Sequence, residues 1–288
     1  MNAHNKARAM VTGAMAIFGT LGIFTRYITV STSELALYRA VIAAALITLF
    51  MLLREGRIDL KGIGKELPLL LISGIAMGIN WILLFEAYRR TTISIATLSY
   101  YFAPVLVMVL SPILFREKLS KKQILCFVMS TLGLVLIIGV GSAGGSITGI
   151  LFGLGAACFY ATVVLLNKFI KNAAGLHRTL LQFYAAILVL VPYVLCSGGM
   201  HPEVLDGNGW LCLLIVGVVH TFLAYCLYFS AIKDLPGQEA AILSYVDPLV
   251  AVLVSVLILG EGISMMQIAG GALVLGFTLW NELGSSRK

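Results

Sequence analysis

The chain has 288 residues, of which 60% are hydrophobic and 11% charged, and its formal net charge is +7. Its mean hydropathy is +1.00. An ordinary soluble domain has about a quarter of its residues charged and about half apolar. This composition therefore excludes soluble globular, disordered, coiled-coil and nucleic-acid-binding proteins, and it predicts a chain that crosses a lipid bilayer many times.

Ten stretches are long and apolar enough to cross about 30 Å of hydrocarbon, which takes roughly 20 helical residues. In chain order they are 9–28, 34–53, 67–88, 93–115, 123–141, 147–170, 179–197, 209–231, 237–260 and 264–283. The loops between them are too short to form a separate domain. The expected fold class is an all-α integral membrane protein with ten transmembrane helices.

The positive charges predict the orientation of these spans. With the N-terminus inside, 16 of the 20 Lys and Arg residues fall in inside segments, and Arg26, Arg89 and Arg90 fall outside. Cytoplasmic loops carry an excess of Lys and Arg. We therefore expect both termini in the cytoplasm and the chain in the cytoplasmic (inner) cell membrane.

The sequence contains no pattern typical of a cofactor or metal site. The five cysteines lie in apolar runs without a C-x-x-C pair, and they are Cys126, Cys158, Cys196, Cys212 and Cys226. Such residues usually act as small buried side chains. No nucleotide-binding loop is present, so direct use of ATP is not expected.

The two halves of the sequence resemble each other. A shift of 144 residues places Phe85, Tyr101, Pro104, Glu117 and Gln123 on Phe229, Tyr245, Pro248, Glu261 and Gln267. Each half holds five predicted spans, an odd number, so the halves enter the membrane from opposite sides. We expect two inverted five-helix repeats, residues 1–144 and 145–288. Inverted repeats are typical of secondary transporters, which bind substrate near the membrane midplane between the halves.

Three sequence features resemble one known family. The segments "FREKLSKKQ" and "LGEGISMMQ" follow the fourth and ninth spans, each of which carries a proline, and Arg39 lies in "LALYRAVIAAAL" in the second span. These features resemble the drug/metabolite transporter superfamily, and within it the EamA-type group. The resemblance implies a ten-helix fold, a central cavity lined by both halves, and, as in many members, export of amino acids or other small metabolites. It does not imply one substrate.

Asp247 is the strongest candidate for a functional residue. Charged groups inside spans are costly and tend to face a cavity or a partner. Asp247 directly precedes Pro248, which lacks a backbone N–H and leaves carbonyls free beside the carboxylate. Its repeat mate is Ala103, so the carboxylate departs from the symmetry. Two hypotheses remain open: binding of a cationic substrate or a proton, and an ion pair with Arg39.

Arg39 and Glu34 are the other charged candidates. The planar guanidinium of Arg39 suits bidentate contact with a substrate carboxylate, and the alternative is a role in helix packing. Glu34 lies at the outer end of the second span, where it either takes part in proton coupling together with Asp247 or is simply solvated.

Aromatic and amide side chains on spans of both halves predict the rest of a lined cavity. Trp81, Tyr101 and Tyr245 are too deep to be interfacial anchors, and each needs a hydrogen-bond partner. Asn80 and Tyr160 complete the expected substrate-binding set. Such a cavity suits an organic cation or an apolar side chain, although each residue taken singly is more often a packing residue.

The sequence predicts a transporter and not an enzyme. We expect a secondary active transporter, acting as an exporter of small metabolites such as amino acids or organic amines and cations, by alternating access and with protons as the coupling ion. Its partners are the lipid bilayer and the small-molecule substrate, and the chain acts as a monomer or a homodimer. The alternative is an intramembrane enzyme that modifies a lipid or a metabolite. The short loops and the isolated His177 and His201 argue against it.

Overall fold

The computed structural model describes residues 3–55, 63–91, 96, 99–116, 118–138, 146–173, 175–258 and 265–285, and every regular element in these ranges is helical. Glu117 and Glu261 of the family-like segments lie outside the described residues. The predicted boundary between the repeats, at 144–145, also lies outside them.

The first half of the chain holds the helices up to α7. They are α1 (Ala3–Gly19), α2 (Leu21–Thr25), α3 (Thr32–Glu55), α4 (Leu67–Arg90), α6 (Ala103–Phe115) and α7 (Lys121–Ile138). Helices α3, α4 and α7 begin and end within a few residues of predicted spans. The first predicted span, 9–28, corresponds to α1 and α2 together, and the fourth starts at 93 whereas α6 starts at Ala103.

The second half holds the remaining helices. They are α8 (Ile147–Phe169), α9 (Gly175–Cys196), η1 (Pro202–Val204), α10 (Gly207–Ile215), η2 (Val216–Leu223), α11 (Ala224–Ala231), η3 (Ile232–Asp234), α12 (Gly237–Leu243), α13 (Val246–Leu257) and α14 (Met265–Ser285). The predicted span 209–231 corresponds to α10, η2 and α11, which follow one another without a break. Here η2 is a π-helix, and the hydroxyl of Thr221 donates to the carbonyl of Val216, 2.9 Å away.

Within the described residues, six helical segments are long and apolar enough to cross a membrane. They are Ala3–Thr25, Thr32–Leu53, Leu67–Arg90, Ile147–Phe169, Gly175–Cys196 and Gly207–Asp234. The protein is therefore an all-helical membrane protein that crosses the bilayer several times.

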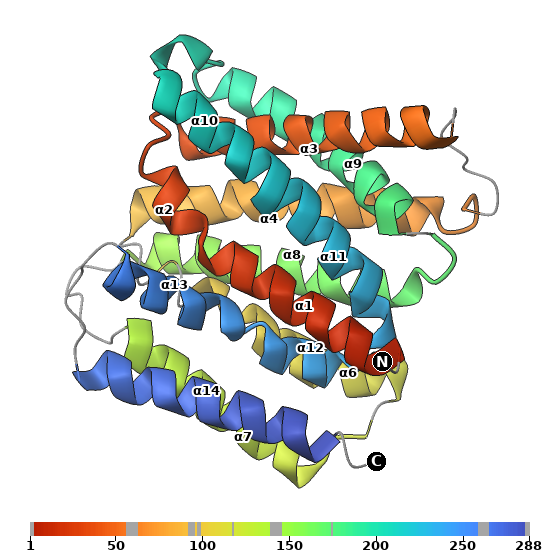
Figure 1. Ribbon diagram of the computed structural model, residues 1–288, viewed down its shortest axis with the longest axis vertical. Coiled ribbons are helices and arrows are strands. Elements are labelled where there is room, and N and C mark those ends of the chain that lie inside the picture. Colours follow the sequence, from red (N-terminus) through yellow and green to blue (C-terminus); the bar gives the residue numbers. More distant parts are fainter. Residues whose placement is uncertain are drawn as a thin grey trace.

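The helices form one bundle in which segments distant in sequence lie side by side (Figure 1). Helix α4 packs along α8 and α9, and α1 packs along α11 and α13. Helix α3 contacts α9 and η2, α6 contacts α8 and α12, and α7 pairs with α14 at one edge. The start of α1 and the end of α14 lie at the same end of the bundle (Figure 1).

Small residues allow the closest helix contact. On α4, a Cβ atom added to Gly74 would lie 2.4 Å from the carbonyl oxygen of Gln182 on α9, and one added to Gly78 would lie 3.1 Å from that of Ala186. Glycines four apart on one helix face let a neighbouring backbone approach. Here they bring α4 against α9 within the chain.

A buried carboxylate ties the start of α4 to the loop between α8 and α9. Glu66 accepts hydrogen bonds from the backbone N–H groups of Lys171, Asn172 and Ala173, at 2.8 to 3.1 Å. Burial raises the pKa of Glu66, but these three donors and the nearby charge of Arg178 outweigh it, so that the pKa lies below its ordinary 4.5.

Arg178, fully buried, completes this end of the bundle. Its guanidinium donates to the carbonyls of Asn167, Ile170 and Phe229. These carbonyls lie at the ends of α8 and α11, where a helix leaves its last carbonyls without internal partners. Arg178 therefore closes two helix ends at once.

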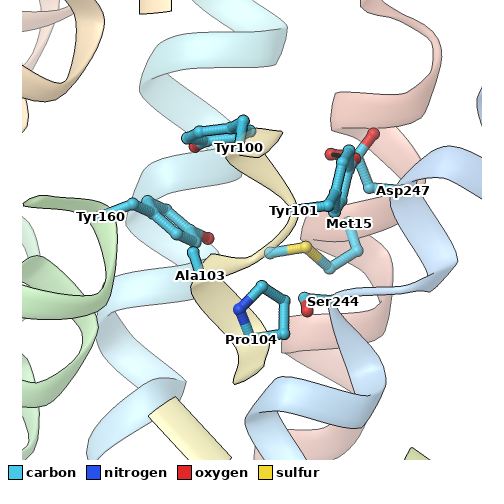
Figure 2. Close-up of a pocket in the computed structure, with 8 residues that line it drawn as sticks. All are labelled: Met15, Tyr100, Tyr101, Ala103, Pro104, Tyr160, Ser244 and Asp247. Carbon is cyan, nitrogen blue, oxygen red and sulfur yellow. Dashed lines mark hydrogen bonds between the residues drawn. The ribbon is translucent and has the colours of Figure 1, made fainter. Parts of the chain in front are cut away.

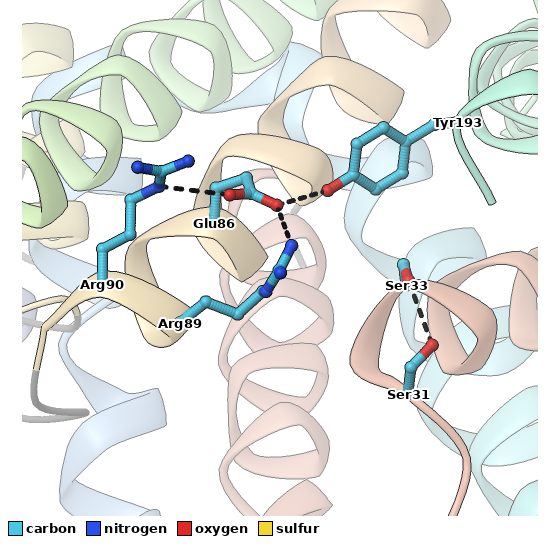
Figure 3. A network of polar contacts seen from close by, with 6 residues as sticks. All are labelled: Ser31, Ser33, Glu86, Arg89, Arg90 and Tyr193. Atoms are coloured by element: carbon cyan, nitrogen blue, oxygen red, sulfur yellow. Dashed lines mark hydrogen bonds and ion pairs between the residues drawn. The ribbon is translucent and has the colours of Figure 1, made fainter. Parts of the chain in front are cut away.

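At the opposite end, Glu86 joins α4 to α9. Its carboxylate pairs with Arg89 at 2.7 Å and Arg90 at 3.2 Å and accepts a hydrogen bond from the hydroxyl of Tyr193 at 2.7 Å (Figure 3). Both arginines are largely exposed, so these ion pairs are worth little on their own. The buried contact with Tyr193 is the stronger tie between the two helices.

We expect Glu66→Gln to lower the melting temperature of the detergent-solubilised protein at pH 7, because the amide NH₂ would face the backbone donors. Losing hydrogen bonds to a buried group costs about 1–3 kcal/mol. The folded pKa of Glu66 is depressed, so its contribution is complete above pH 4.5 and is lost as the pH falls through the folded pKa. The melting temperature of the variant should therefore decline less in acid.

The control is Glu203→Gln, which alters an exposed carboxylate on η1. Equal melting curves of the Glu66 and Glu203 variants between about pH 3.5 and 7 would show that Glu66 does not stabilise the folded protein.

Candidate functional site

Two interrupted helices meet in the interior of the bundle. Proline cannot donate a backbone hydrogen bond to the residue four positions earlier. Pro248 follows the break between α12 and α13, and Pro104 follows a turn at Tyr101 and Phe102 that precedes α6. The predicted span 237–260 is thus two helices, α12 and α13, because the proline interrupts it.

A cavity lies between these breaks, and helices α1 and α8 complete its wall (Figure 2). Its empty volume is about 290 Å³ including the space at its open mouth, and the interior is narrow enough to suit water-sized molecules. The residues that line it are Met15, Tyr100, Tyr101, Ala103, Pro104, Tyr160, Ser244 and Asp247.

Asp247 supplies the only carboxylate among these lining residues. One of its oxygens accepts a hydrogen bond from the hydroxyl of Tyr101, 2.9 Å away. No Lys, Arg or His of the described residues lies within 4 Å of it. A carboxylate surrounded by protein and without a cation partner is costly, so this position favours a role in binding a proton or a cation.

Tyrosine rings form the wall opposite the carboxylate. The ring centroid of Tyr100 lies 5.9 Å from that of Tyr101 and 5.6 Å from that of Tyr160, and the hydroxyl of Tyr160 lies 3.5 Å from that of Tyr228. The negative faces of such rings attract a cation. The wall therefore suits the same kind of ligand as Asp247.

Arg39 lies in a second aromatic cluster. Its guanidinium carbon lies 4.5 Å from the centroid of the Trp81 ring. Tyr225 packs edge-on against Trp81 at 6.2 Å and against Phe183 at 5.4 Å. The Tyr225 hydroxyl lies within electrostatic reach of both Arg39 and Asp247. The two charged residues thus flank the same tyrosine.

Arg39 and Asp247 do not form an ion pair. Among the described residues, no carboxylate lies within 4 Å of the Arg39 guanidinium, and its buried Nε atom has no hydrogen-bond partner. The ion pair with Arg39, which was one of the two hypotheses for Asp247, is therefore not formed in this conformation.

Four predicted binding residues do not line the cavity: Arg39 and Trp81, which lie in the second aromatic cluster, and Tyr245 and Asn80, which make packing contacts. Tyr245 is fully buried against Phe127, and its hydroxyl lies 2.6 Å from that of Thr131 on α7. Asn80 donates to the carbonyl of Ala156 at 2.7 Å and so holds α4 against α8. Both side chains already have their polar partners in packing contacts.

Glu34 is also engaged in local contacts. It accepts hydrogen bonds from the backbone N–H groups of Ser31 at 3.0 Å and His201 at 2.6 Å, and from the hydroxyl of Tyr38. It therefore anchors the start of α3 to the loop that precedes η1. The cavity beside Asp247 does not include it.

Met15 and Ser244 are lining residues that the sequence did not reveal. Met15 comes to the cavity because α1 packs against α13, and no local pattern around Met15 signals that packing. Ser244 lies at the helix break, where its hydroxyl donates to the carbonyl of Ala241 at 2.7 Å. Its position three residues before Asp247 was the available signal.

A metal-binding cluster is not present in the described ranges, where no three His, Cys, Asp or Glu side chains gather. The architecture and the site define a multi-pass helical membrane protein with a charged, tyrosine-lined cavity inside the bundle.

The model of the EamA-like transporter family matches residues 6–139 and 147–281. The chain belongs to this family, which is part of the drug/metabolite transporter superfamily.

Similar proteins agree with this membership. The chain is 30% identical over 263 residues to the uncharacterized transporter YxxF of Bacillus subtilis (strain 168), with 89% of this chain and 83% of that protein covered. It is 29% identical to an uncharacterized transporter of Archaeoglobus fulgidus, covering 95% and 96% of the two chains. It is 28% identical to the protein PecM of Dickeya dadantii (strain 3937), covering 72% and 73%. A solved crystal structure with 18% sequence identity has the same fold, with a TM-score of 0.84 over 96% of both chains.

We expect Asp247→Asn to leave the melting temperature within about 3 °C of the parent. The amide oxygen can accept the hydrogen bond from Tyr101, and no ion pair is broken. Removing a charge from the interior also removes a desolvation cost. A melting temperature more than about 6 °C below that of the parent, measured by thermal unfolding at about pH 7.5, would show instead that the Asp247 carboxylate stabilises the folded protein.

Proposed function

We propose that the chain is a secondary active transporter with ten transmembrane helices, built as two inverted five-helix repeats, residues 1–144 and 145–288. It moves small metabolites such as amino acids or organic amines and cations by alternating access, and protons are the coupling ion. The observation that carries this proposal is the pair of oppositely charged side chains, Arg39 and Asp247, which lie inside an apolar bundle without an ionic partner.

The packing of the helices supports the inverted repeat. If the first five spans are exchanged with the last five, the contact between α4 and α8 becomes the contact between α11 and α1, and both are present. The contact between α4 and α9 becomes that between η2 and α3, and the contact between α6 and α8 becomes that between α13 and α1. Both contacts of each pair occur. The family model also matches the chain twice, once in each half.

The positive charges support the orientation. The start of α1 and the end of α14 lie at one end of the bundle (Figure 1), as an even number of spans requires. With the N-terminus inside, 16 of the 20 Lys and Arg residues fall in inside segments of the sequence, and cytoplasmic segments carry such an excess. We therefore place both termini in the cytoplasm and the protein in the cytoplasmic membrane. One chain contains both charged residues and the cavity, which favours a functional monomer.

Arg39 and Asp247 suit the two ends of a zwitterion. A guanidinium binds a carboxylate through two parallel hydrogen bonds, and a carboxylate with a tyrosine wall suits an ammonium group. In the present conformation the cavity is too narrow for an organic solute, so substrate entry requires movement of the interrupted helices. A ligand or proton drives this movement only if it interacts differently with the two states, and protonation of Asp247 provides such a difference. The direction, export, rests on the resemblance to the family.

We expect Asp247→Asn to abolish proton-coupled transport. Ligands are first identified by thermal shift with amino acids, amines, nucleosides and organic cations, because a ligand that binds the folded state raises its stability. Uptake of a labelled ligand into proteoliposomes is then measured with and without a pH gradient. The parent should respond to the gradient and the variant should not. The control, Glu203→Gln, alters an exposed carboxylate and should behave as the parent. A normal response of the Asp247 variant to the gradient would exclude Asp247 from coupling.

We expect Arg39→Gln to discriminate between ligand classes. If Arg39 binds the substrate carboxylate, the affinity of the variant for an amino acid falls by about tenfold or more, and the thermal shift given by that amino acid is lost. The thermal shift given by the corresponding decarboxylated amine is kept. Arg39→Lys keeps the charge without the bidentate geometry and should give an intermediate result. Equal weakening of amino acid and amine would contradict a carboxylate contact at Arg39.

A further inference from the structure

The cavity beside Asp247 continues toward the end of the bundle that holds the N-terminus. A second cavity shares Pro104, Tyr160 and Ser244 with the first. Its other lining residues are Val107, Val164, Tyr228, Ala240 and Ala241. The two cavities therefore mark one path between α6, α8, α11 and α12, and the second one ends at the first turn of α12.

A buried ion pair closes the path beyond this point. Arg8 of α1 contacts Glu239 of α12 through its Nε atom, and the two residues are only 7% and 4% exposed. Arg8 lies two helical turns before Met15, which lines the first cavity. Glu239 directly precedes Ala240, which lines the second. The pair therefore joins α1 to α12 across the end of the path. The Nε2 atom of His4 lies 3.2 Å from the other oxygen of Glu239.

A second contact closes the side formed by α6 and α8. The ammonium group of Lys168 lies 4.3 Å from the centroid of the Phe115 ring, and that ring lies 4.8 Å from the ring of Phe169. Lys168 is one helical turn beyond Val164 of the second cavity, and Phe115 is two turns beyond Val107. Helices α1, α6, α8 and α12 thus each place a side chain of these two contacts beyond the second cavity.

Two polar side chains next to this closure are buried without partners. Among the described residues, neither amide atom of Gln238, which is 1% exposed, has a hydrogen-bond partner, and neither has the hydroxyl of Ser111 on α6. Buried polar groups are almost always hydrogen-bonded, and leaving them unpaired is costly. Water would satisfy them if the path opened at this end. The closed arrangement therefore carries a cost that opening relieves, as expected of a gate and not of a permanent seal.

We propose that Arg8 and Glu239 form the gate at the N-terminal end of the path, and that Gln238 and Ser111 line the aqueous vestibule that appears when α1 and α12 separate. This inference rests on the proposed function, because a gate has a role only in a protein that works by alternating access. It concerns a different set of residues from the charged pair at the centre, and it can be tested without a substrate.

The test measures the accessibility of a reporter cysteine. Ala241, which lines the second cavity, is changed to Cys in a chain whose five native cysteines are replaced by alanine. A charged, membrane-impermeant thiol reagent is added to right-side-out and to inverted membrane vesicles, and the rate of labelling is measured. In the parent background the reporter should react slowly from the N-terminal side, because the gate is closed.

Glu239→Gln should increase labelling from the N-terminal side about tenfold, which corresponds to a shift of about 1.4 kcal/mol between closed and open states. Arg8→Gln removes the same pair from the other helix and should have the same effect. Labelling from the opposite side should not increase. The matched control is Glu86→Gln, which removes a paired carboxylate at the other end of the bundle and should leave N-terminal-side labelling unchanged.

Unchanged labelling in both the Glu239 and Arg8 variants would overturn the gate, and so would an equal rise in the Glu86 control. A rise in only one of the two gate variants would also overturn it, because the pair would then not act as a unit. Faster labelling together with no transport of any solute would leave the gate intact and count against the proposed transport function. The two proposals therefore fail in different ways.

Discussion

The arrangement of the interior depends on the inability of proline to donate a backbone hydrogen bond. Inside a membrane every backbone group must find a partner within the protein, so a helix that contains proline is interrupted and its neighbours must accommodate the freed carbonyls. Pro104 and Pro248 create such interruptions on two helices that contact each other, α6 and α12 with its continuation α13. Tyr101 lies in the turn before α6 and Asp247 in the first turn of α13, directly before Pro248, and a hydrogen bond joins their side chains at the cavity.

Charged side chains divide into two groups by their partners. Glu66 at one end and Glu86 at the other are each held by several donors, and they stabilise contacts between helices. Asp247 and Arg39 lie deeper, where the free-energy cost of a charge is greatest, and neither has an ionic partner among the described residues. Stability alone would favour apolar residues of similar size at both positions. The proposed interactions with a ligand or a proton would account for their presence.

The sequence predicted those features that depend on local patterns. Long apolar runs predicted the helices, because a span requires a minimum apolar length. Asp247 was found because its carboxylate and Pro248 are neighbours in sequence. The partnership of Arg8 with Glu239 was not predicted: Arg8 lies in a basic segment that indicated orientation, and only the packing of α1 on α12 turns it into a buried ion-pair partner. Likewise, Tyr245 matches Tyr101 in the repeat, yet its hydroxyl reaches Thr131 on α7 instead of the cavity.

The different surroundings of these two tyrosines bear on how the halves can move. At the repeat shift of 144 residues, Asp247 corresponds to Ala103 and Thr131 to Leu275. If the halves simply exchanged conformations, the Tyr245 hydroxyl would meet Ala103, whose side chain cannot accept a hydrogen bond. A buried tyrosine hydroxyl without a partner is unfavourable. In the proposed alternating-access cycle the two end states are therefore not mirror copies of equal energy, and the hydrogen bond between Tyr101 and Asp247 favours the conformation in which the cavity beside Asp247 is present.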